Sequence, residues 1–141
     1  MHTTIRKLAL LSCVIALSCS AQDRYQCGDQ KGFLKSPTEG LILEIDAPIT
    51  VKSVRGTVVF LDDNDSALKD ALFEIRGPGT SERIRAAVSD ARGRFAIPHV
   101  PEGTYAFKAT KNAYLSVVGT VVVSKKADPQ KRILIVMPPG V

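Results

Sequence analysis

Apolar side chains alternate with polar ones along most of the chain between residues 54 and 137, in short segments separated by residues that favour turns. In the first segment Val54, Val58 and Phe60 share one side, and Arg55 and Thr57 occupy the other. A period of two is that of a β-strand, because successive side chains point to opposite faces. Short segments of this kind at fairly even spacing are typical of a β-sandwich. The pattern therefore predicts an all-β fold whose strands each bury one face.

The alternating segments number seven. They cover residues 54–60, 71–75, 84–88, 95–97, 105–109, 114–124 and 132–137. Turn residues, among them Gly77-Pro78-Gly79, separate one segment from the next. We therefore predict a seven-stranded antiparallel Greek-key β-sandwich over residues 49–141. One alternative stays open, because residues 66–73 also carry apolar side chains at helical spacing.

The first 21 residues have the organisation of a signal peptide. Arg6 and Lys7 precede an apolar stretch over residues 8–18, and small residues follow up to Ala21. The stretch is too short to cross a bilayer as a helix. We predict cleavage after Ala21, so that the exported chain begins at Gln22 and is secreted or periplasmic.

The same region offers an alternative to simple secretion. Residues Ala16-Leu17-Ser18-Cys19 resemble a bacterial lipobox, in which the cysteine is lipidated and becomes the new N-terminus. Cys19 would then carry a lipid anchor and hold the protein at the cell envelope. Both hypotheses place the protein outside the cytoplasm.

Residues 22–48 predict a polar N-terminal tether that contains a short extra strand. The stretch carries several Gly and Pro residues that interrupt regular structure, and its apolar run is at residues 41–45. Cys27 would be the one cysteine left after cleavage at Ala21, so we expect no intrachain disulfide. The folded domain is predicted to follow this tether.

The charge of the chain argues against some partners. Removal of residues 1–21 lowers the formal net charge from +5 to +3. The remaining basic residues are spread among acidic ones, without the basic stripe and interleaved aromatics of a nucleic-acid surface. We therefore expect no nucleic-acid partner. No apolar run reaches the length of a membrane span.

Residues that could support catalysis are scarce. His99 is the one histidine after residue 21, and it stands in a turn between Pro98 and Val100. A catalytic triad needs a positioned base beside a nucleophile, and no serine or cysteine lies in a recognisable nucleophile motif. The sequence therefore predicts no catalytic residue and no cofactor.

The acidic run at residues 62–65 is the best candidate for a metal site. Asp62, Asp63 and Asp65 could direct several oxygen ligands toward Ca²⁺ from one short loop. Ala67 and Leu68 stand where an EF-hand loop would place a ligand and its glycine, which favours a solvated turn. We therefore predict no bound metal, with calcium as the alternative.

Four sequence elements share a wider resemblance. They are Val54-x-Gly56-x-Val58, Ala71-x-Phe73-x-Ile75, Asp90-x-x-Gly93-x-Phe95-x-Ile97 and Val100-Pro101-x-Gly103-x-Tyr105-x-Phe107-x-Ala109. This combination resembles the carboxypeptidase regulatory-like domain over roughly residues 50–137. The resemblance implies a transthyretin-like sandwich of seven strands.

Six residues of these elements are expected to have structural roles. They are Gly56, Asp90, Gly93, Phe95, Gly103 and Tyr105. Gly93 and Gly103 suit turn positions with positive φ. Phe95 and Tyr105 are expected to fill the space between the sheets, and the Tyr105 hydroxyl to bond a backbone group near a strand crossing.

The resemblance does not bring peptidase activity with it, because a zinc site needs several ligands and the chain offers one histidine after residue 21. We therefore predict an exported, non-catalytic accessory or interaction module of the cell envelope. Its partner would be an unidentified protein or envelope component. The alternative is a carbohydrate-binding module of a related sandwich fold, with Tyr25 and Tyr114 as platforms for a glycan.

Overall fold

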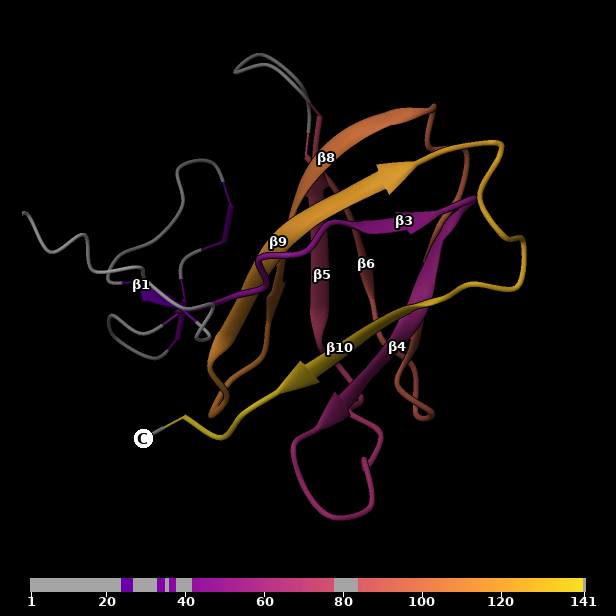
Figure 1. Ribbon diagram of the computed structural model, residues 1–141. Helices are drawn as coiled ribbons and strands as arrows, with labels where there is room; N and C mark the ends of the chain where they lie inside the picture. Colours follow the sequence, from indigo (N-terminus) through magenta and orange to yellow (C-terminus); the bar gives the residue numbers. More distant parts are fainter. Residues whose placement is uncertain (1–23, 27–32, 35, 38–41, 78–83, 141) are drawn as a thin grey trace, which may run out of the picture.

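The computed structural model describes residues 24–26, 33–34, 36–37, 42–77 and 84–140 (Figure 1). Within these residues the chain forms strands and turns and no helix. The strands are β1 (Arg24–Gln26), β2 (Ile42–Glu44), β3 (Ile49–Val51), β4 (Val54–Phe60), β5 (Leu72–Arg76), β6 (Arg85–Val88), β7 (Arg94–Ile97), β8 (Gly103–Thr110), β9 (Ser116–Val123) and β10 (Ile133–Met137). The predicted all-β fold is confirmed.

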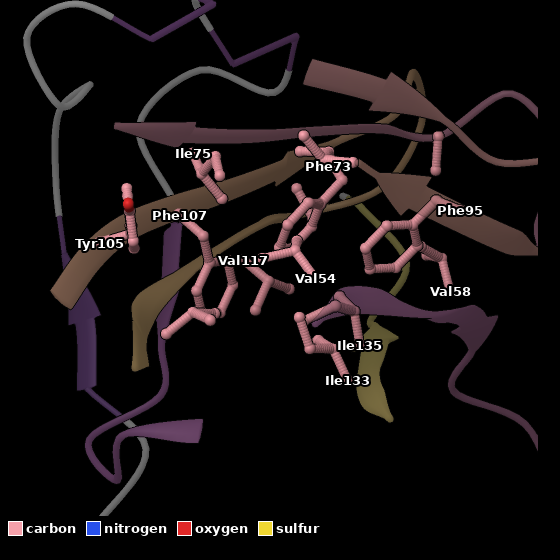
Figure 2. Close-up of a cluster of buried hydrophobic side chains, with 14 of the residues drawn as sticks. Val54, Val58, Phe73, Ile75, Phe95, Tyr105, Phe107, Val117, Ile133 and Ile135 are labelled. Atoms are coloured by element: carbon pink, nitrogen blue, oxygen red, sulfur yellow. The ribbon is translucent and has the colours of Figure 1, made fainter. Parts of the chain in front are cut away.

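The strands form two sheets. The larger sheet has the order β1-β2-β9-β8-β5-β6, with β3 also paired to β9, and the smaller has the order β10-β4-β7. Side chains from both sheets meet in one buried cluster, and Figure 2 shows them pointing into the space between the sheets. Phe73 of the larger sheet stacks on Phe95 of the smaller one, with ring centroids 4.3 Å apart. The fold is therefore a β-sandwich.

The seven alternating segments of the sequence correspond to β4 through β10. In six of them the apolar positions set by period two lie in or against the core, for example Val54, Val58 and Ile135. In β6 the expected face is wrong, because Val88 is 58% exposed while Ala87 packs against the core. The helical alternative for residues 66–73 is wrong. Ala67 forms an antiparallel bridge with Val59, and the Leu68 N–H donates to the Val58 carbonyl at 2.9 Å.

The expectation of a purely antiparallel sandwich is also wrong. β10 pairs in parallel with β4, and these two strands lie side by side in Figure 1. β2 and β3 both pair in parallel with β9. The physical reason is connectivity: the chain crosses from β4 to the larger sheet, visits the smaller sheet again at β7, and reaches β10 from β9 of the larger sheet. β10 is therefore joined to β4 by crossovers and not by a hairpin, which would force an antiparallel pairing.

The described parts of residues 22–48 lie on the larger sheet. β2 adds to β9, and Phe33 and Ser36 are buried although they precede the predicted domain. The predicted signal peptide, Cys19 and Cys27 lie outside the described residues. Among the residues that the structure does describe, no helix has the length and apolar character needed to span a membrane.

Two glycines, Gly56 and Gly93, permit close backbone contacts that fix how the strands of the smaller sheet pack. A Cβ on Gly56 would lie 2.1 Å from the carbonyl oxygen of Ile133, so β4 and β10 could not pair at this register with any larger residue. Gly93 has φ +72°, a backbone conformation that side chains disfavour, in the turn that leads from β6 to β7. Both features help to shape the groove described next.

A candidate binding groove beside two edge strands

An open groove of about 660 Å³ lies where strands β6 and β7 form the edges of the two sheets. Its lining comes from β4, β6, β7, the β6–β7 turn and the residue before β10. The lining residues are Arg55, Gly56, Thr57, Ala87, Val88, Asp90, Arg94, Phe95, Ala96 and Arg132. In the described part of the chain, β6 pairs only with β5 and β7 only with β4. The groove therefore adjoins two strand edges with unpaired backbone.

Strand register brings three arginines to this groove. Arg55 alternates with the buried Val54 and Gly56 and so faces away from the core. In the antiparallel pairing of β4 with β7, Thr57 lies opposite Arg94. In the parallel pairing of β4 with β10, Gly56 lies opposite Ile133, which puts Arg132 next to Arg55. The three arginines come from distant parts of the sequence.

Two of these guanidinium groups share one backbone acceptor. The Arg55 Nη2 donates to the Pro129 carbonyl at 3.0 Å, and the Arg132 Nη1 donates to the same carbonyl at 3.1 Å. The Arg55 Nε is buried and has no hydrogen-bond partner among the described residues. Neither guanidinium forms an ion pair with a described carboxylate. Two positive charges thus lie close together, and their guanidinium groups have further N–H donors that these two bonds do not use.

Asp90, the acidic residue that lines the groove, accepts hydrogen bonds from backbone groups of its own turn. One carboxylate oxygen of Asp90 accepts hydrogen bonds from the backbone N–H of Arg94 and of Arg92, both at 2.9 Å. These bonds, that of Arg94 first, hold the pKa of Asp90 below its usual value of 3.8. The carboxylate stays ionised and orders the turn that leads to β7.

Large apolar side chains are exposed beside the arginines. Val88, in the lining of the groove on β6, is 58% exposed, and Leu134 on β10 is 55% exposed. Leu134 is paired with Thr57, so it lies on the same outer face as the basic residues. The surface therefore combines positive charge, apolar side chains and strand edges.

The predicted structural residues lie partly in this groove and partly at the opposite end of the core. Gly56, Asp90 and Phe95 line the groove. Gly103 has φ +156°, and Tyr105 is buried with its hydroxyl donating to the Pro101 carbonyl at 2.7 Å. That bond is of the kind that the sequence predicts for Tyr105.

The three aspartates considered for calcium do not act as one ligand set. The carboxylate of Asp62 accepts from the Asn64 and Ser66 N–H groups, both at 3.1 Å, and from the Ser66 hydroxyl at 2.7 Å. These bonds, that of the hydroxyl first, lower the pKa of Asp62. Asp63 and Asp65 are exposed. No group of three or more His, Cys, Asp or Glu residues suited to a metal ion occurs within the described residues.

His99 is exposed in a turn and has φ +56°. Its carbonyl accepts from the Arg85 Nη1 at 3.0 Å, and the Pro98 carbonyl accepts from the Arg85 Nη2. Glu102 lies three positions after His99, and its carboxylate accepts the backbone N–H of Lys125 at 2.6 Å. The described contacts of these residues are those of turns.

Of the two aromatic residues proposed to bind a glycan, the structure describes the side chain of Tyr114 and only the backbone of Tyr25. Tyr114 is half-buried, and its ring packs edge-on against Phe60 with centroids 5.4 Å apart and planes at 79°. The backbone of Tyr25 pairs with Leu43, while its side chain is outside the described structure. Glycan binding stays a prediction.

Sequence reasoning missed the basic groove because the three arginines look dispersed in the chain. Arg55 and Arg94 are identifiable as outward positions of alternating segments. Their grouping with Arg132 depends on which strands pair and in which register, and the parallel pairing of β4 with β10 was not foreseen. Only the order and register in which the strands pair would have indicated that these three arginines lie together.

Comparisons with known proteins leave the family open. No protein-family model matches the chain, and no curated protein matches it. Among solved structures, it is similar to a chain in the crystal structure of an interface mutant of a type II cohesin–X-dockerin complex from Acetivibrio cellulolyticus. The identity is 30% and the TM-score 0.42, over 61% of this chain. The match spans 56% of that chain, little more than half its length.

Proposed function

We propose that this protein is a non-catalytic β-sandwich module that binds a protein partner through the groove beside β6 and β7. The observation that carries the proposal is the juxtaposition of two unpaired strand edges with three arginines and the exposed Val88. Edge strands of monomeric proteins are usually short, charged or covered, and an exposed edge recruits a further strand. Exposed apolar side chains beside such an edge add to the area a partner could bury.

We also propose that the domain is a transthyretin-like Greek-key sandwich of the carboxypeptidase regulatory-like type. The division of β4 through β10 into four strands of the larger sheet and three of the smaller supports this. So do the positive φ values of Gly93 and Gly103 and the buried positions of Phe95 and Tyr105.

Export to the cell envelope belongs to the same proposal, and its support is the sequence of residues 1–21. Mass spectrometry of the protein isolated from its host tests it. We expect a mature N-terminus at Gln22, and the alternative is a lipidated Cys19. A protein that keeps Met1 and the residues after it would contradict export.

Site-specific photo-crosslinking tests the interaction. A photoreactive amino acid replaces Val88 in the full chain expressed in its host, and the matched control carries it at the exposed Lys126. We expect one discrete protein adduct from position 88 that position 126 does not give. If neither position yields an adduct, or both yield the same one, the groove is not a partner site.

Enzyme assays test the non-catalytic part. Hydrolysis of peptides, esters or ureides by the purified protein, at a rate that survives His99→Ala, would contradict it. Binding on a glycan array that is lost in Tyr114→Ala would instead favour the carbohydrate-binding alternative.

A further inference from the structure

We infer that the groove takes an acidic, extended segment of the partner, with carboxylates bound by Arg55 and Arg132. The inference rests on the proposed function and adds the chemistry of the partner. The segment would lie in the groove over the outer face of the smaller sheet, with carboxylates toward the arginines and apolar side chains toward Val88.

The charge argument begins with the shared carbonyl of Pro129. Two guanidinium groups donate to this one oxygen, at 3.0 and 3.1 Å, and no described carboxylate pairs with either. Like charges brought together in this way repel, and an anion between them relieves that repulsion. The arrangement favours a ligand that carries negative charge to this point.

The hydrogen-bond argument concerns Arg55 itself. Its guanidinium uses Nη2 for Pro129, while its buried Nε has no partner among the described residues. A buried donor without an acceptor is unfavourable. A carboxylate accepts two parallel N–H bonds from one guanidinium, so turning Arg55 toward a carboxylate would satisfy donors that Pro129 leaves unused.

The groove suits an extended peptide better than a dense polyanion. Asp90 contributes a negative charge to the lining, and Asp128 stands next to Pro129 in the chain. A nucleic acid carries a phosphate at every nucleotide and would meet these carboxylates. An extended peptide can alternate acidic and apolar side chains, and so can match arginines on one side and Val88 on the other.

The test uses fluorescence anisotropy with the full chain and a labelled dodecapeptide of alternating Glu and Val, at low salt. We expect saturable binding that weakens at least tenfold in the double variant Arg55→Gln with Arg132→Gln. Glutamine keeps a polar amide group at each position but removes both charges. The matched control, Lys125→Gln with Lys126→Gln, removes the same charge from the exposed turn after β9 and should change the affinity less than twofold.

Three results with the peptides would overturn the inference. They are no binding of the peptide, equal weakening in both double variants, and equal binding of a Gln-Val peptide that lacks the charge. A single-stranded DNA oligonucleotide that binds more tightly with the same dependence on Arg55 and Arg132 would also overturn it, because the groove would then take nucleic acid. Thermal unfolding of each variant separates loss of binding from loss of fold.

The crosslinking experiment keeps the two proposals apart. An adduct at position 88 that forms equally well in Arg55→Gln with Arg132→Gln leaves the interaction module intact and contradicts the acidic segment. Absence of any adduct contradicts the interaction module itself.

Discussion

The Lys108 Nζ donates a 2.5 Å hydrogen bond to the carbonyl of Leu34, a residue 74 positions earlier in the chain. Lys108 is fully buried on the outer face of the larger sheet, where it pairs in register with Glu74. The Glu74 carboxylate accepts the Leu34 N–H at 3.2 Å, so both members of the pair contact the same backbone residue. The described residues at 33–36 thus cover a buried pair of opposite charges.

We predict that Lys108→Met lowers the free energy of unfolding by about 3 kcal/mol, because it leaves Glu74 buried without its cation. Urea denaturation measures this. The double variant Lys108→Met with Glu74→Leu should recover much of the loss, since replacing a whole buried ion pair by apolar residues is often neutral. A single variant as stable as the wild type would show that the described residues 33, 34 and 36 do not close over the pair.

Glu74 also predicts a pH dependence. Burial raises its pKa above the ordinary value of 4.5, and the Leu34 N–H and the charge of Lys108 oppose this only in part. A carboxyl with a raised pKa contributes its full stability below its unfolded pKa and loses it as pH rises through the folded pKa. We therefore expect the wild type to lose stability relative to Glu74→Gln as pH rises above 4.5. Unfolding curves of both proteins at several pH values check the sign, and a difference that grows in the opposite direction would contradict it.

The alternation of apolar residues predicted the strands and the core because a side chain's face follows directly from its position in a strand. The alternation did not predict which other segments of the chain cover the outward-facing side chains. Lys108 alternates with Phe107 and Ala109 and so belongs to the outer face, yet it is fully buried by a segment that composition describes as a polar tether. That burial depends on contacts over 74 positions of chain, which no local pattern encodes.

The basic groove escaped prediction for a related reason. Arg55, Arg94 and Arg132 meet only after three strands have paired, and one of those pairings is parallel. Tyr105 was easier, because its bond to Pro101 spans four positions and lies within one turn of the chain. Local contacts were predictable from the sequence and long-range ones were not.

Tyr105→Phe removes a hydroxyl whose bond to the Pro101 carbonyl measures 2.7 Å, while the buried ring stays in place. We expect a loss of about 1 kcal/mol, the usual net contribution of such a bond. Thermal or urea unfolding measures it. Tyr105→Leu, which removes the ring as well, should cost clearly more. If the two variants were equally stable, the ring would not be part of the packed core.

Gly93→Ala should be among the more destabilising alanine substitutions in the smaller sheet. Gly93 has φ +72°, where a Cβ is disfavoured, and the added carbon would lie 2.4 Å from the Val58 carbonyl oxygen. That oxygen accepts the Leu68 N–H at 2.9 Å, so the Cβ must displace a used backbone group. We expect a loss of about 2–4 kcal/mol from strain and overpacking. Gly103→Ala is the matched control: Gly103 also has positive φ, at +156°, but the nearest atom to its Cβ is in the Tyr105 ring at 3.6 Å. Equal losses in urea denaturation would show that backbone strain alone sets the cost and that the contact with Val58 relaxes freely.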